Sequence, residues 1–117
     1  MPKQEMEFWD PFADGAGEWV PITGVDGLAE LVLSVDEVTG SYTRLLKFEP
    51  GADTTPMGVQ RHDFWEEVLI YKGAIHDLTL GQTFYAGQYA CRPPGMAHGP
   101  WVAAEGCITF EIRTYRL

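Results

Sequence analysis

Glycine and proline occur along the whole chain, and they limit the length of any regular element that it can form. The 117 residues include 13 glycines and 8 prolines. They divide the chain into short segments separated by turns, which is typical of a sandwich or barrel of many strands. We therefore predict an all-β fold with little helix.

Several of the segments have the alternation, or the β-branched and aromatic residues, that favour strands. Residues 41–50 carry apolar side chains on both sides, which predicts a strand buried on both faces. Gly73 is expected to end another strand. A closed barrel or a double-sheet jelly roll would hide the edges of such short strands. The predicted strands cover residues 28–36, 41–50, 66–73, 74–80 and 107–117.

The beginning of the chain lacks these signals. The stretch "DPFADGAGE" breaks any regular element, so residues 1–25 are predicted to form an irregular arm and residues 26–117 a single barrel domain. The arm carries Phe8, Trp9 and Phe12, which it cannot bury by itself. We expect it to pack over its own barrel or across a second subunit. A homodimer is the expected arrangement, because two-fold pairs dominate soluble oligomers.

Charge and composition limit the kinds of molecule that the protein can be expected to bind. The net charge is −9, with 17 acidic against 8 basic residues, which argues against nucleic acid and against anionic membrane surfaces as partners. The start "MPKQEMEFWD" has no basic segment followed by an apolar one, and no apolar run approaches the roughly 20 residues needed to span a bilayer. We expect a cytoplasmic protein that acts on a small molecule, with Cys91 and Cys107 as thiols.

Histidine is scarce, and its placement draws attention. One of the three histidines, His62, precedes Glu66 by four residues. In a regular strand, Gln60, His62, Phe64 and Glu66 share one face, and Glu67 points away. A turn between them could reset this alternation, so the choice between the two glutamates stays open. The stretch is either half of a metal site or an ordinary strand with a polar rim.

A second histidine follows a stiff corner. Proline fixes φ and glycine permits positive φ, so residues 93–95, Pro-Pro-Gly, have a defined shape that can aim His98 into a cavity. Two histidines and one carboxylate form the facial triad that suits non-haem iron(II). The third histidine, His76, lies outside both stretches and is expected on a sheet face.

The spacing of the first stretch is similar to the first motif of the cupin family. That motif runs glycine, five residues, His-x-His, a short spacer, glutamate, six residues, glycine. Glu66 is followed by six residues and then by Gly73, and His62 falls on the second histidine. Gln60 stands in place of the first histidine, and Thr54 in place of the leading glycine.

The second stretch resembles the second cupin motif, in which glycine is followed by five residues, Pro-x-Gly, two residues and histidine. Gly87, Pro93, Gly95 and His98 fit this pattern without a gap. The resemblance covers residues 40–115. Within cupins, the sequence looks most like acetylacetone dioxygenase-like proteins, dihydroxyacetophenone dioxygenase-like proteins and the cupin half of zinc-containing anti-sigma factors.

The resemblance implies a jelly-roll β-barrel that holds a divalent metal at His62, Glu66 and His98. Gln60 would be a fourth ligand, a group bridged to the metal by water, or no ligand. The implied metal is iron(II), with manganese, nickel or zinc as alternatives. The implied function is that of a small dioxygenase that cleaves a carbon–carbon bond in a chelated β-diketone or hydroxy-ketone. Glu66 would double as a catalytic base if it were loosely bound.

Two other functions remain open. The same cage with a fourth ligand would suit zinc in a sensor or binding module without catalysis, because structural zinc sites are tetrahedral and closed. An isomerase, cyclase or lyase that works without oxygen is the other alternative, because fold alone does not decide the chemistry. For any of them, we expect Phe64, Phe110 and Ile112 to contact the substrate.

Overall fold

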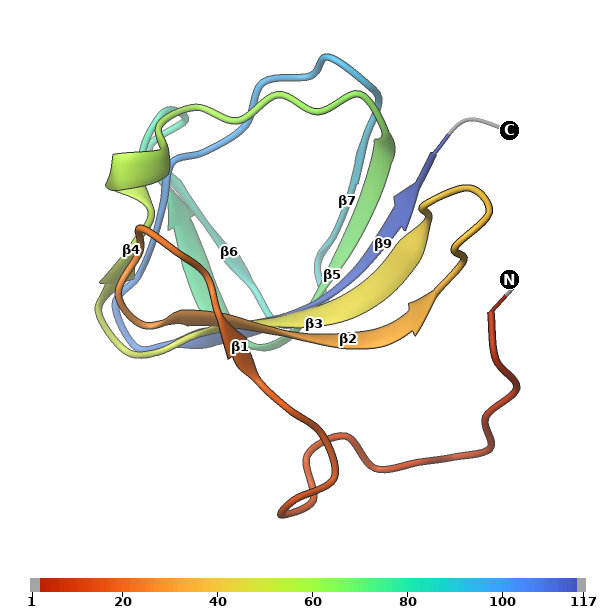
Figure 1. Ribbon diagram of the computed structural model, residues 1–117. Coiled ribbons are helices and arrows are strands. Elements are labelled where there is room, and N and C mark those ends of the chain that lie inside the picture. Colours follow the sequence, from red (N-terminus) through yellow and green to blue (C-terminus); the bar gives the residue numbers. More distant parts are fainter. Residues whose placement is uncertain (1–2, 116–117) are drawn as a thin grey trace.

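The computed structural model describes residues 3–115, which form an all-β fold (Figure 1). The strands pair antiparallel in one curled sheet of order β1-β2-β3-β9-β5-β8-β4, and β6 and β7 also pair with β5. The prediction of an all-β chain is confirmed. The elements within residues 3–115 are β1 (Val20–Pro21), β2 (Leu28–Val35), β3 (Tyr42–Phe48), β4 (Ala52–Asp53), the 3₁₀ turn η1 (Thr55–Met57), β5 (Trp65–Asp77), β6 (Gln82–Tyr85), β7 (Tyr89–Arg92), β8 (Trp101–Ala103) and β9 (Cys107–Thr114).

Strand β5 connects the two walls of the barrel. It pairs with β9 and β7 in its first half and with β6 and β8 in its second half. The prediction that Gly73 ends one strand before a second begins is wrong, because β5 runs through this glycine to Asp77. The register with β9 shifts between Ile70 and Lys72, and Gly73 has a φ of +82°. This irregularity bends the strand without ending it.

The centre of the sheet is buried on both faces, as predicted for residues 41–50. In β3, Arg44, Leu46 and Phe48 point into the barrel, and Thr43 and Leu45 are buried on the outer side. An apolar cluster fills one end of the interior. Its buried members are Val25, Leu28, Leu46, Phe48, Ala52, Ile70, Ile75, Ala103 and Cys107.

The N-terminal arm crosses outside the barrel, below β2 and β3 in Figure 1. Phe12 stacks on Tyr71 with ring centroids 5.2 Å apart, and Lys47 lies 4.4 Å from the ring of Trp19. The arm therefore packs on its own barrel, while Phe8 is 99% exposed. The short strand β1 already lies within the range expected for the arm, where Val20 pairs with Glu30. Within the described range, the chain has no helix of the length and apolarity that a membrane span requires.

Candidate metal centre

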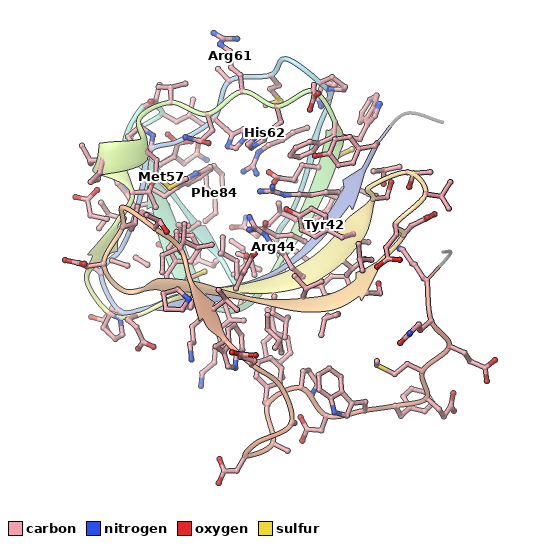
Figure 2. All side chains as sticks on the ribbon, viewed as in Figure 1. Tyr42, Arg44, Met57, Arg61, His62 and Phe84 are labelled. Atoms are coloured by element: carbon pink, nitrogen blue, oxygen red, sulfur yellow. The ribbon has the colours of Figure 1, made fainter. Side chains whose placement is uncertain are left out.

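The barrel encloses a cavity of about 570 Å³ that is polar at one end and apolar at the other. Alternation along the strands decides which residues line it. In β9 these are Thr109, Glu111 and Arg113. In β5 they are Glu66, Val68 and Ile70 before the register shift, and Ile75 and Asp77 after it. Figure 2 shows Arg44, His62 and Phe84 directed toward this interior, and Arg61 directed away from it. The apolar end is lined by residues that include Leu28, Leu46, Phe48, Ile70, Ile75 and Phe84.

His62, Glu66 and His98 converge at the polar end. One possible ligand atom from each lies within 4.8 Å of the others, and the two imidazole centroids are 4.9 Å apart. Glu66 begins the inward row of β5, and the histidines come from two loops that pair with each other. The backbone groups of Gln60 and His98 exchange hydrogen bonds of 2.7 and 2.9 Å, and the Gly95 N–H donates to the His62 carbonyl at 2.7 Å. The Pro-Pro-Gly corner is thus tied directly to the loop that carries His62.

The structure also separates the two glutamates. Glu66 is 3% exposed and faces inward. Glu67 does not line the cavity, and its carboxylate accepts a hydrogen bond of 2.6 Å from the Tyr89 hydroxyl. The regular alternation from Trp65 to Ile70 places Glu66 inside and Glu67 outside.

The histidines are suited to bind a cation. Both ring nitrogens of His98 are buried and have no hydrogen-bond partner among residues 3–115. Burial, together with the positive charge of Arg92 and the nearby His62, lowers the pKa of His98 to about 4. Burial also lowers the pKa of His62, although the Glu66 carboxylate opposes the shift. Both imidazoles are therefore neutral near pH 7 and have lone pairs to offer. With Glu66 they fit a divalent metal ion, since a metal would satisfy the buried His98 nitrogens, which have no partner in the described part of the chain.

Gln60 lines the cavity, but its amide already has a partner. Its Nε2 donates to the Met57 carbonyl at 2.8 Å. The structure brings Gln60 next to His98 by backbone pairing. Its role as a metal ligand stays a prediction.

Two arginines that the sequence analysis did not single out hold the candidate ligand Glu66. Arg92 Nη1 donates to Glu66 Oε1 at 2.8 Å, and the Nε and Nη2 of Arg113 lie 3.2 and 3.1 Å from Oε2. These three side chains form a row of ion pairs across neighbouring strands, because Glu66 pairs with Arg92 on β7 and with Arg113 on β9. Arg113 also donates to the Tyr42 hydroxyl at 2.8 Å.

A second ion-pair cluster lies one row deeper. Arg44 Nη2 is 2.8 Å from Glu111 Oε1, and its Nη1 contacts the Glu30 carboxylate. The Thr109 hydroxyl donates to Glu111 at 2.8 Å. Burial by itself would lower the pKa of Arg44, but the Glu111 and Glu30 carboxylates outweigh it and raise the pKa. The guanidinium therefore stays charged inside the barrel.

The expected substrate-contacting residues lie elsewhere. Phe110 and Ile112 alternate with the residues that line the cavity, so they belong to the opposite face of β9, and the expectation that they line the pocket is wrong. Phe64 is also absent from the lining. It packs behind His62, with ring centroids 4.5 Å apart and the planes nearly parallel. Of the strand predicted over residues 107–117, residues 116–117 lie outside the described part of the chain. Over the described strand β9, the alternation separated the two faces correctly, but the inner face is the charged one.

Residues 12–114 match the family described as the ChrR cupin-like domain, and the chain belongs to this family. It is thus a cupin-family domain with a group of residues that could hold a metal ion. None of the curated proteins compared with the chain matches it.

Solved structures with the same fold include proteins of different activities. An RmlC-like cupin from Shewanella frigidimarina is 22% identical, with a TM-score of 0.73 over 99% of this chain and 96% of the other. An acetylacetone dioxygenase from Acinetobacter johnsonii is 19% identical, with a TM-score of 0.72 over 94% and 75%. A chain in the complex of Rhodobacter sphaeroides SigE with the anti-sigma factor ChrR is 23% identical, with a TM-score of 0.62 over 82% and 48%. These likenesses confirm the expected cupin fold.

Proposed function

We propose that this protein is a small metal-dependent dioxygenase that cleaves a carbon–carbon bond in a β-diketone or hydroxy-ketone. The observation that carries the proposal is the convergence of His62, Glu66 and His98 in the cavity. Both ring nitrogens of His98 are buried there, and no residue from 3 to 115 gives them a hydrogen bond. The similarity in fold to an acetylacetone dioxygenase supports the substrate class.

The residues at the polar end of the cavity would hold the metal, and those at the apolar end would hold the substrate. His62, Glu66 and His98 would hold the ion, which we propose to be iron(II), with manganese, nickel and zinc as the alternatives to test. When bound, it would supply Lewis acidity to a chelated carbonyl compound and a place for oxygen to react. Apolar side chains such as Ile75 and Phe84 would exclude water and hold the rest of the substrate.

Glu66 acts in this proposal as a ligand and not as a mobile base. Both of its carboxylate oxygens already accept hydrogen bonds from guanidinium groups, which fix its position. A base must be free to take and release a proton during the reaction. The earlier expectation of a catalytic base at Glu66 is therefore not part of the proposed mechanism.

Metal analysis tests the site itself. Protein purified without added metal, and then loaded with iron(II) without oxygen, is expected to hold close to one ion per chain. His98→Gln should lose most of this metal and keep its folded circular dichroism spectrum. His76→Gln is the matched control, because His76 lies outside the cavity lining and contacts Thr83. Equal metal content in both variants would contradict the assignment.

Oxygen uptake tests the reaction. The iron(II)-loaded protein is expected to consume about one oxygen molecule per molecule of acetylacetone cleaved, and His98→Gln should lose this activity. Cleavage or rearrangement without oxygen uptake would instead identify a lyase, isomerase or cyclase.

A metal-binding module without catalysis is the second candidate. The family to which the chain belongs is described by the anti-sigma factor ChrR, and this observation favours the alternative. Stoichiometric zinc that is retained during purification, with no turnover of diketones after exchange to iron(II), would establish the module and exclude the dioxygenase.

A further inference from the structure

We propose that the molecule bound at the metal centre carries a carboxylate group, and that Arg92 binds it. This inference rests on the proposed function, because it places the carboxylate beside oxygens that chelate the metal. It concerns the chemical class of the substrate. It follows from which guanidinium nitrogens of the cavity arginines already donate hydrogen bonds to the protein.

In two of these arginines, every guanidinium nitrogen already has a partner in the protein. The Nε, Nη1 and Nη2 of Arg113 are all engaged, by Glu66 and by the Tyr42 hydroxyl. The same atoms of Arg44 are engaged by Glu111 and Glu30. These two guanidinium groups are structural members of the ion-pair rows.

Arg92 differs from both. Its Nη1 donates to Glu66 at 2.8 Å, and within residues 3–115 its Nε and Nη2 have no protein acceptor. The side chain is only 13% exposed and lines the cavity. The guanidinium carbon lies 5.0 Å from the centre of the Trp101 ring, so the indole supports the group from one side. A guanidinium with free donors inside a cavity is suited to a planar anion, which it can bind with two parallel hydrogen bonds.

The charge balance points to the same conclusion. The three guanidiniums of the two rows face three carboxylates, those of Glu30, Glu66 and Glu111. The other carboxylate of the cavity, Asp77, accepts hydrogen bonds from the backbone N–H groups of Thr79 and Leu80. These N–H groups carry no net charge, so Asp77 offsets one of the two positive charges that a divalent ion would add. The cavity would then keep one net positive charge in a largely buried place, which favours an anionic ligand.

A dicarbonyl compound that binds as a monoanion neutralises this charge, and a carboxylate on the same molecule would pair with the free donors of Arg92. The substrate class that fits is thus a β-diketo acid, or another oxo acid whose carboxylate is separate from the chelating oxygens. A neutral diketone would leave the free donors of Arg92 without an anionic partner.

Two probes that differ in one terminal group test the inference. Acetylacetone ends in a methyl group at the position where acetylpyruvate has a carboxylate. Their affinities are measured by calorimetry on protein loaded with zinc, which binds the probes without oxygen chemistry. The two compounds differ in their own affinity for the metal, so the quantity compared between variants is the ratio of the two dissociation constants.

Arg92→Gln is expected to reduce the preference for acetylpyruvate about tenfold or more, because a charge-assisted hydrogen bond is lost. Arg61→Gln is the matched control. It removes an equal charge from an arginine that donates to the Gly95 carbonyl and points away from the cavity (Figure 2). This control should keep the wild-type ratio.

A change of less than threefold in Arg92→Gln, or an equal loss in Arg61→Gln, would overturn the inference. Zinc content is measured for every variant, so that a loss of carboxylate binding can be distinguished from a loss of the metal. If the wild type holds zinc and the ratio does not depend on Arg92, only the carboxylate inference fails. If the wild type holds no metal, the proposed function fails and the inference fails with it.

Discussion

Position 60 holds an amide where the first cupin motif has an imidazole. The Gln60 side chain lines the cavity, and its Nε2 is held by the Met57 carbonyl. The residue is paired through its backbone with His98, so it lies beside the proposed ligands. This single position determines whether the metal would have three or four ligands from the protein.

Gln60→His should bind the metal more tightly, by about tenfold or more, because imidazole is a stronger ligand than an amide oxygen for transition metals. Competition with a chelator of known affinity gives the dissociation constants. Gln82→His is the control, since Gln82 is exposed on β6 and does not line the cavity. Unchanged affinity in Gln60→His would place residue 60 beyond contact with the metal.

At the scale of elements, the bend in β5 depends on a glycine. Gly73 has a φ of +82°, and an added Cβ would meet the carbonyl oxygen of Gly106 and the Cα of Cys107. The strand therefore carries both Glu66 on one wall and Ile75 on the other only if this position has no side chain.

Gly73→Ala should destabilise the protein by about 2–4 kcal/mol, from backbone strain together with the clash against β9. Urea unfolding gives the value. In Gly81→Ala the strain is similar, with a φ of +65°, but nothing lies within 4 Å of the added Cβ. This control is expected to lose only about 1–2 kcal/mol. Equal losses would show that the contact with Gly106 is unimportant.

Most of the elements could be predicted from the sequence, and so could the proposed ligands. The spacing of the two stretches predicted that His62, Glu66 and His98 would converge, and the structure brings them together. The ion-pair rows could not be predicted, because they depend on register between strands far apart in the chain. In β9, we expected the apolar residues Phe110 and Ile112 to face inward, as they would in a packed core. They face outward, because β9 borders a cavity that is lined by charged side chains.

At the scale of the whole molecule, large apolar side chains stay exposed on the arm and on the barrel. Phe8 is 99% and Met6 56% exposed, and Trp65 and Tyr89 are about half exposed on the barrel. Exposed apolar residues of this number favour an interface. We predict a homodimer in which the arm of one copy contacts the other.

Deletion of the first eleven residues should convert this dimer to a monomer of the same fold, because Phe12 and its stack on Tyr71 are retained. Light scattering after size exclusion gives the mass, and Phe8→Ser provides a milder variant. A mass that is the same for wild type and deletion at every concentration would exclude the arm from any interface.

The cavity changes from charged to apolar along its length, and this has a consequence for how its specificity can change. In the proposed function, the head of a ligand would meet Arg92 and Glu66, which the pairing of β7 and β9 with β5 fixes in place, and the two histidines, whose loops pair with each other. The tail meets Ile75, Phe84 and similar side chains, which carry no charge and belong to no ion-pair row. Mutation can therefore remodel the tail end in small steps while the charged end stays intact. If the protein is the enzyme that we propose, its descendants can diverge in the length of the substrate that they accept without losing the metal site.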